Sequence, residues 1–360
     1  MKILTVVGAR PQFIKTAPLS AEINTKVGCQ EIVVHTGQHY DENMSDIFFH
    51  ELGLKKPDHY LNVGSGSHGA QTASMLEKIE SCVVAEKPDR VLVYGDTNST
   101  LAGALVAAKL HIPVAHVEAG LRSFNRRMPE EINRVVTDHV SDYLFAPTEI
   151  AVENLLQEGR PKSAVFNVGD VMQDVAIIFG ERAKANSTVL QSNKLTEKEF
   201  ALVTIHRAEN TDSLENLRWI TRELLELSVH IPVVLPLHPR TKKALEDHGL
   251  HIALCSAKNI LFLEPLGYLD MVRMEQAAKV IVTDSGGVQK EAFFQGTPCV
   301  TVREETEWKE LVTYGWNRLC PPRGNQSLAD LAISSNKGVH IDSLYGDGTA
   351  AKQIVDILLT

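Results

Sequence analysis

Short runs of β-branched and other apolar residues alternate with segments of helical periodicity along almost the whole chain. Near-continuous apolar strands between amphipathic helices are typical of parallel sheets with both faces covered by helices. The runs predict strands at residues 2–8, 31–36, 90–94, 112–116, 143–146, 163–168, 200–205, 231–237, 259–264, 278–283 and 297–302. The clearest helical segments are residues 70–86, 99–109, 148–158, 213–228 and 268–276.

This spacing predicts an α/β protein with two Rossmann-like, doubly wound domains that face a cleft. With 360 residues, 44% of them hydrophobic, the chain is long and apolar enough for a core in each domain. We expect the first domain to span residues 1–168 and the second to span residues 169–346. Gly346 and Gly348 could let the last segment, residues 347–360, with a helix from about Thr349, turn back onto the first domain.

The net charge of −9 argues against nucleic acid or an anionic membrane surface as a partner, because both attract cationic surfaces. No apolar run reaches the roughly 18 residues that a membrane span requires. The opening residues MKILTVVG predict a strand and not a signal peptide. The five cysteines are scattered and form no C-x-x-C pair, as expected for reduced thiols of a cytoplasmic protein without a metal site.

Ligands of an open parallel sheet bind beyond the carboxyl ends of its strands, and the residues after the predicted strands are unusually polar. The sequence Asp284-Ser285-Gly286-Gly287 follows a strand and opens a helix. Free N–H groups and the positive helix end favour an anion there, and glycine allows close approach, so this turn predicts a phosphate site. Ser285 adds a hydroxyl donor, and Glu291 could accept from a ribose diol. The alternative is a tight turn capped by Asp284 or Ser285.

Cationic side chains follow the first strand. Arg10 and Lys15 could neutralise a diphosphate, with Arg10 as a bidentate clamp. The alternative is a pair of solvated surface cations, the usual position of Arg and Lys. A further polar residue, His238, follows the strand predicted at residues 231–237.

Acidic residues follow the middle strands of the first half. Asp96 and Glu118 each come after a buried strand and should project into one crevice. With Glu130 and with His206 of the second half they could form an acid–base array. The alternatives are a helix N-cap for Asp96, matching of the helix dipole for Glu130 and Glu131, and a structural hydrogen bond for His206.

The segment from Gly64 to Gly69 matches G-x-G-x-x-G literally. It follows a polar segment and not a long buried strand, and no acidic residue closes a following strand at the expected distance. We therefore predict a flexible loop, which could cover the active site, and not a nicotinamide site.

The chain resembles the non-hydrolysing UDP-N-acetylglucosamine 2-epimerases over essentially its full length. The resemblance is carried by Gly8-Ala9-Arg10-Pro11 with Lys15, Gly95-Asp96-Thr97, His116-Val117-Glu118-Ala119-Gly120-Leu121-Arg122, Pro129-Glu130-Glu131 with Asn133-Arg134, Thr204-Ile205-His206-Arg207, Thr283-Asp284-Ser285-Gly286-Gly287 with Glu291, and Tyr345-Gly346-Asp347-Gly348. It implies a glycosyltransferase-B-like fold, a homodimer and no cofactor. It also implies that the ligand is a UDP-linked N-acetylamino sugar, whose UDP is bound mainly by the second domain.

The resemblance also implies a mechanism, in which UDP is eliminated across C1–C2 and adds back to a glycal with the proton delivered to the other face. The positions implied to be catalytic are Asp96, Glu118, Glu130 and His206. Those implied to bind UDP are Arg10, Lys15, Arg134, Ser285, Gly286 and Glu291, and their neighbours Glu131, His238 and Gly287 complete the expected substrate-binding set.

Two motifs, Ala9-Arg10-Pro11-Gln12 and Thr204-Ile205-His206-Arg207, depart from the commoner form of the family. They are similar to the subgroup that acts on UDP-2,3-diacetamido-2,3-dideoxyglucuronate, so both this sugar and UDP-N-acetylglucosamine stay open. Relatives activated by UDP-N-acetylglucosamine carry an arginine near the position of Ser74, and Gln38 and His39 would be what remains of that allosteric pocket.

Three other functions stay open from the sequence. They are a glycosyltransferase with the same UDP site, a hydrolysing epimerase that releases the free amino sugar, and a nucleotide-sugar sensor without turnover. The complete set of carboxylates and histidine argues against the sensor.

Overall fold

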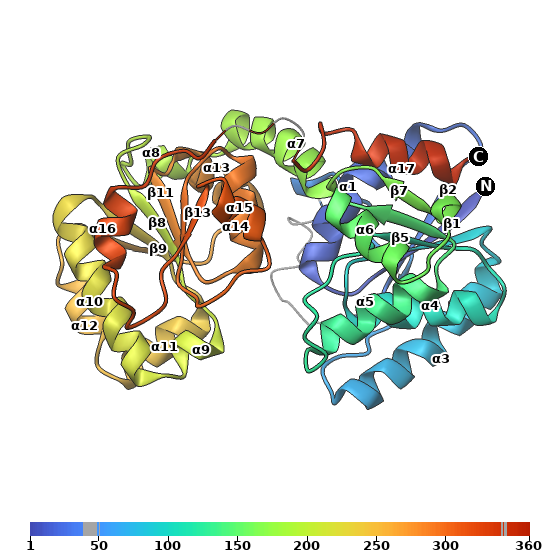
Figure 1. Ribbon diagram of the computed structural model, residues 1–360, viewed down its shortest axis with the longest axis horizontal. Coiled ribbons are helices and arrows are strands. Elements are labelled where there is room, and N and C mark those ends of the chain that lie inside the picture. The colour runs from blue at the N-terminus through green and yellow to red at the C-terminus, as the bar shows by residue number, and fades with distance from the viewer. Residues whose placement is uncertain (39–48, 50, 340, 342–343) are drawn as a thin grey trace. The chain divides into compact units, whose positions relative to one another are not determined.

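The computed structural model describes residues 1–38, 49, 51–339, 341 and 344–360. Its contacts divide the chain into two units, Met1–Val175 with Asp342–Thr360, and Ala176–Ile341 (Figure 1). The division falls inside helix α7 (Val171–Asn186), whereas the sequence placed the boundary after residue 168.

The first unit contains a seven-stranded sheet in which all strands are parallel. Its strands lie across the sheet in the order β3 (His59–Tyr60), β2 (Gln30–His35), β1 (Lys2–Val7), β4 (Arg90–Tyr94), β5 (Val114–Val117), β6 (Tyr143–Ala146) and β7 (Val165–Asn167). Its helices are α1 (Arg10–Thr25), α3 (His68–Glu86), α4 (Asn98–Lys109), α5 (Pro129–Val140), α6 (Glu149–Gln157), α17 (Ala350–Leu358) and the short 3₁₀ helix η1 (Lys162–Ala164).

The second unit contains a six-stranded parallel sheet. Its strands lie in the order β10 (Ile260–Leu263), β9 (Val233–Pro236), β8 (Ala201–Thr204), β11 (Val280–Thr283), β12 (Cys299–Thr301) and β13 (Asn317–Leu319). Its helices are α8 (Val189–Ser192), α9 (Ala208–Thr211), α10 (Leu214–His230), α11 (Pro239–Asp247), α12 (His251–Cys255), α13 (Tyr268–Ala277), α14 (Gly286–Phe294), α15 (Lys309–Thr313) and α16 (Leu328–Ile333).

The predicted fold class, two doubly wound α/β sheets, is confirmed, and each predicted apolar run contains a strand. The sequence missed the two edge strands β3 and β13, which are two and three residues long. An edge strand pairs on one side only and needs no long apolar run, so β3, with Tyr60 49% exposed, leaves little hydrophobic signal.

Each sheet has a point at which the direction of strand order reverses. In the first sheet it lies between β1 and β4, and in the second between β8 and β11. The loops that leave the two strands at such a point run to opposite sides and open a crevice at the carboxyl edge. By this rule, ligands are expected after β1 and β4 in one unit and after β8 and β11 in the other.

The C-terminal helix α17 packs against α1 in the first unit. Its N-terminus is capped by Asp174 of α7, whose carboxylate accepts from the N–H groups of Ala350 (3.2 Å) and Ala351 (3.1 Å). Burial raises the pKa of Asp174 to about 6 despite these hydrogen bonds. In the part of the chain that the structure describes, no helix combines the length and apolarity needed to cross a bilayer.

Candidate active site

Glu118 lies at the carboxyl edge of the first sheet, one residue after β5, and forms an ion pair with Lys15 of α1. It is 8% exposed, and its backbone has φ +69°, a left-handed conformation that non-glycine residues seldom adopt. A side chain at Gly95, at the end of β4, would place its Cβ 3.3 Å from Glu118 Oε2 and 3.8 Å from Lys15 Nζ. Glycine at 95 therefore lets the turn after β4 pass close to this ion pair.

Asp96 follows Gly95 and lies at the switch point between β1 and β4. Its carboxylate forms an ion pair with Arg134 of α5, and its carbonyl accepts from Asn133 Nδ2 at 2.9 Å. Burial opposes the charge of Arg134, but Asp96 and Glu131 together raise the pKa of its guanidinium. The Asp96 side chain is 32% exposed, so it is oriented by α5 and still open to a ligand.

Glu131, predicted to bind substrate, is buried and engaged within the first unit. Its carboxylate accepts from the N–H groups of Ser123 and Phe124, each at 2.9 Å, and from Arg134 at 3.0 Å. Burial opposes its charge, but these donors lower the pKa of Glu131. Glu131 therefore fixes the loop after β5 and orients Arg134, whereas Glu130 is exposed on the first turn of α5.

Gln12, which the sequence analysis did not single out as a site residue, joins the turns after β1 and β4. Its side-chain carbonyl accepts from the N–H groups of Gly8 (2.7 Å) and Ala9 (3.1 Å), and its amide donates to the carbonyl of Tyr94 at 2.8 Å. It is 2% exposed. Arg10, the first residue of α1, is thereby held beside the switch point.

Gln38 is buried, and its side-chain carbonyl accepts from the N–H (3.0 Å) and the hydroxyl (2.7 Å) of Ser99 on α4. The side-chain amide of Gln71 donates to the main-chain carbonyls of Gln38 (3.2 Å) and Gly64 (2.8 Å). These hydrogen bonds link the glycine-containing loop before α3 to Gln38. That loop follows the two-residue strand β3. His39 lies outside the described residues.

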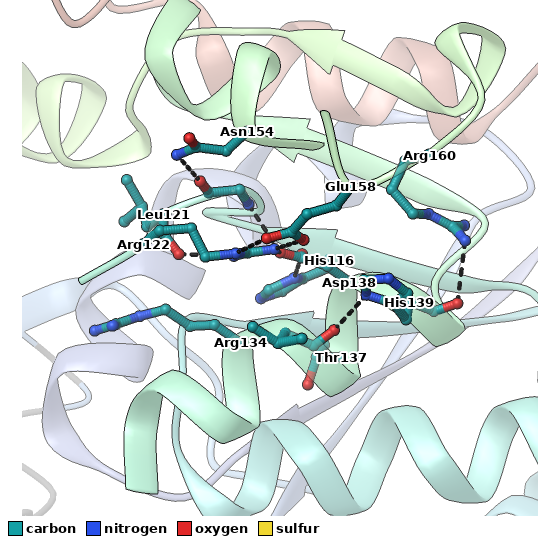
Figure 2. A network of polar contacts seen from close by, with 12 residues as sticks. His116, Leu121, Arg122, Arg134, Thr137, Asp138, His139, Asn154, Glu158 and Arg160 are labelled. Atoms are coloured by element: carbon teal, nitrogen blue, oxygen red, sulfur yellow. Dashed lines mark hydrogen bonds and ion pairs between the residues drawn. The ribbon is translucent and has the colours of Figure 1, made fainter. Parts of the chain in front are cut away.

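Four further residues form a polar network that runs from the buried pair His116 and Asp138 to Glu158, whose side chain is 27% exposed. Figure 2 shows His116, Asp138, Arg122 and Glu158 in contact one after another. His116 and Asp138 are 0% exposed. No role was predicted for His116 or Asp138, because a contact between a strand residue and a helix residue 22 positions away cannot be recognised from local sequence patterns.

In the second unit, Asp284 holds together the turns after β8 and β11. Its carboxylate is 0% exposed and accepts from the N–H groups of His206 and Arg207, both at 3.0 Å, and from Asn210 Nδ2 at 3.0 Å. The sequence analysis offered Asp284 as a cap of α14, but its hydrogen bonds go to the neighbouring turn. Ser285 caps that helix, accepting from the N–H of Val288 at 3.5 Å.

The two histidines predicted after β8 and β9 lie beside each other. The rings of His206 and His238 have their centroids 5.7 Å apart. His238 Nδ1 accepts from the N–H of Arg240 at 3.2 Å, so its proton is on Nε2, and burial lowers its pKa. The side chain of His206 is 41% exposed, and His238 is exposed as well.

Helix α14 begins at Gly286 with its free N–H groups at the switch point of the second sheet. The Gly286 carbonyl accepts from Trp308 Nε1 at 2.8 Å. A Cβ at Gly286 would collide with the carboxylate of Glu307, which is paired with Arg303 at 2.8 Å, whereas a Cβ at Gly287 would meet only Ser285 Oγ at 3.9 Å. Glu291 lies on the same helix, five residues after Gly286.

These contacts predict that Gly286→Ala weakens UDP binding by about tenfold, close to 1.4 kcal/mol, because the methyl group displaces Glu307 and covers the helix N-terminus. Isothermal titration with UDP measures the change. Gly287→Ala, which adds the same methyl group where there is space, is the matched comparison and should have a much smaller effect. Equal losses in the two variants would contradict the steric argument.

Comparison with known proteins gives a consistent result. The profile of the UDP-N-acetylglucosamine 2-epimerase family matches residues 21–359. The UDP-2,3-diacetamido-2,3-dideoxy-D-glucuronate 2-epimerase of Pseudomonas aeruginosa is 51% identical over 362 residues, covering 99% of each chain.

Solved structures agree with the sequence comparison. The crystal structure of the Methanocaldococcus jannaschii UDP-GlcNAc 2-epimerase, in complex with UDP-GlcNAc and UDP, matches with a TM-score of 0.88 at 45% identity, covering 100% of this chain and 99% of that chain. That of the Neisseria meningitidis enzyme bound to UDP-GlcNAc matches with a TM-score of 0.86 at 33% identity, covering 100% of both. The resemblance carried by the motifs is thereby confirmed, and the chain belongs to the UDP-N-acetylglucosamine 2-epimerase family and is an isomerase.

Proposed function

We propose that this protein inverts C2 of a UDP-linked 2-acetamido sugar by eliminating UDP and adding it back. A carboxylate takes the C2 proton, the C1–O bond breaks, and its electron pair leaves with the UDP oxygen, so that a C1=C2 double bond remains. UDP then adds to C1 while a proton reaches the opposite face of C2. The sequence of steps is redox-neutral and requires no cofactor.

The observation that carries the proposal is the pair Asp96 and Glu118 at the carboxyl edge of one sheet, after the neighbouring strands β4 and β5, each held by a cation. The C2 proton is weakly acidic, so two carboxylates suit its removal from one face and its return to the other. Lys15 lies beside the carboxylate of Glu118, and Arg134 lies beside that of Asp96. We include Glu130 as a third carboxylate, since its exposure on α5 leaves it open to a ligand.

Negative charge develops on the diphosphate as it leaves, so positive groups and hydrogen-bond donors around it are needed to stabilise this charge. We assign this work to Arg10, to the N-terminus of α14 at Ser285 and Gly286, and to His206 with His238. Glu291 is assigned to the ribose hydroxyls. In this arrangement the first unit supplies the carboxylates and Arg10, and the second unit supplies the other groups that bind UDP.

We further propose UDP-2,3-diacetamido-2,3-dideoxyglucuronate as the preferred substrate. Support comes from the full-length similarity to the Pseudomonas aeruginosa enzyme and from the motifs after β1 and β8. A role in surface polysaccharide biosynthesis, a cytoplasmic location and a homodimeric state belong to the same proposal. Sedimentation of the purified protein at several concentrations measures the oligomeric state.

A turnover assay in D₂O with both candidate UDP sugars tests the proposal. We expect inversion at C2, deuterium in the product at C2, and a higher kcat/KM for the diacetamido glucuronate, all read by NMR. Faster turnover of UDP-GlcNAc would overturn the substrate assignment but leave the reaction in place. Transfer of the sugar to an acceptor, release of the free amino sugar, or binding without exchange would instead favour a glycosyltransferase, a hydrolysing epimerase or a sensor.

A further inference from the structure

His116 lies on β5, two residues before Glu118, with its ring enclosed in the first unit. Its two ring nitrogens face different partners. Nδ1 is 2.7 Å from Asp138 Oδ1, and Nε2 is 2.8 Å from the carbonyl oxygen of Gly95. Figure 2 shows the ring between β5 and the carboxylate on α5.

Both of these partners are hydrogen-bond acceptors. A carbonyl oxygen has no hydrogen to give, and an ionised carboxylate has none either. A neutral imidazole has one N–H and one bare nitrogen, so one of the two short contacts would join two acceptors. Only the imidazolium, with a hydrogen on each nitrogen, satisfies both at 0% exposure.

The surrounding charges balance such a cation. Asp138 is 0% exposed and also accepts from Arg122 at 2.7 Å and from the N–H of Gly120 at 3.0 Å. Arg122 forms a bidentate pair with Glu158, at 2.8 and 2.7 Å. Burial alone would raise the pKa of Asp138, but His116 and Arg122 lower it. Two cations and two anions thus alternate along the network, so the buried charge is compensated.

The network ends at the two turns that carry the proposed proton-transfer groups. The Gly95 carbonyl belongs to the residue immediately before Asp96, and the Gly120 N–H lies two residues after Glu118. Glu118 has φ +69°, in the left-handed region that a non-glycine residue keeps only where its surroundings impose it. Gly95 has φ +64°, which glycine adopts without strain. His116 thus bonds to the turn that carries Asp96, and Asp138 bonds to the turn that carries Glu118.

We propose that His116 is a positioning residue of the reaction: as a buried imidazolium between Asp138 and the Gly95 carbonyl, it fixes the turns that place Asp96 and Glu118 against the substrate. It touches neither substrate nor the migrating proton. The positioning role rests on the proposed function. The double protonation of the His116 ring rests on the hydrogen-bond geometry alone.

The state of the ring is tested without any substrate. In protein labelled with ¹⁵N in its histidines, both ring nitrogens of His116 should show protonated-type chemical shifts and a one-bond coupling to hydrogen at neutral pH. The signal is assigned by its absence from His116→Gln and by its shift in Asp138→Asn. A bare nitrogen in His116 of the wild-type protein would overturn the proposal whatever the activity.

The positioning role is tested by kinetics on the full chain with both UDP sugars. Glutamine can still donate to the Gly95 carbonyl, but its second polar atom is an acceptor that faces Asp138. We expect His116→Gln to lower kcat at least tenfold while KM and the UDP dissociation constant change less than about threefold. In His116→Gln/Asp138→Asn the asparagine amide can donate to the glutamine carbonyl, so part of the lost kcat should return.

The matched control is His59→Gln, because His59 pairs with the carboxylate of Glu86 at 2.9 Å but lies at the edge strand β3 with its side chain 32% exposed. It should leave kcat unchanged. An inactive wild-type protein would count against the proposed function, while the ring state would still decide the inference. An active wild type with an equally active His116→Gln, or a loss no greater than that of His59→Gln, would overturn the inference alone.

Discussion

Asp96→Asn and Glu118→Gln are each expected to lower epimerase turnover by roughly 10²–10⁴-fold, the range that general acid–base groups contribute. Both substitutions keep the shape of the side chain and remove its basicity. The amide oxygen introduced at position 96 can still accept a hydrogen bond from Arg134, and the one at position 118 can accept from Lys15, so the fold should persist. UDP affinity should stay close to that of the wild type, because UDP is assigned to the second unit.

The measurements are kcat with each UDP sugar, deuterium uptake at C2, and the UDP dissociation constant. Glu77→Gln, an exposed carboxylate on α3, is the control and should behave as the wild type. If Asp96→Asn or Glu118→Gln turns over at the wild-type rate, that residue has no role in proton transfer. If both lose UDP affinity in parallel with kcat, the assignment of UDP to the other unit is wrong.

The second large effect is expected for Asp284→Ala, which should lower the free energy of unfolding by about 3–5 kcal/mol. The substitution removes the shared acceptor of His206 N–H, Arg207 N–H and Asn210 Nδ2 in a place with 0% exposure. Buried donors left without an acceptor cost about 1–3 kcal/mol each, partly relieved by relaxation and water. The turn that presents His206 should also loosen, so UDP affinity should fall.

Urea unfolding followed by circular dichroism measures the loss. Asp212→Ala is the comparison, because Asp212 forms an exposed ion pair with Arg240 at 2.6 Å, and surface pairs contribute little. We expect its unfolding midpoint to stay near that of the wild type. Similar midpoints for Asp284→Ala and Asp212→Ala would show that the Asp284 hydrogen bonds do not support this turn.

Much of the fold was predictable because buried parallel strands carry a strong local signal. Strands such as β4 and β11 consist almost entirely of apolar residues, and every residue of β11 is buried. The edge strands β3 and β13 escaped prediction because their short pairing adds little burial to the sequence pattern.

The site was predictable in part, for a reason that lies in parallel-sheet topology. Polar residues directly after parallel strands lie at one edge of the sheet. For that reason Asp96 was predicted to lie near Glu118, and His206 and Ser285 were predicted at the same edge of the second sheet. It contained no sign that Glu131 accepts hydrogen bonds from the loop after β5, because that depends on where the loop folds.

By itself, the sequence determined the fold class, the family and the order of the polar motifs, since each of these is written in local periodicity and short spacing. The tertiary structure alone decided which charges pair: Lys15 with Glu118, Arg134 with Asp96, and His116 with Asp138. These pairs join residues between 22 and 103 positions apart. A side chain's partner over such a separation depends on how strands and helices pack, which no local pattern records.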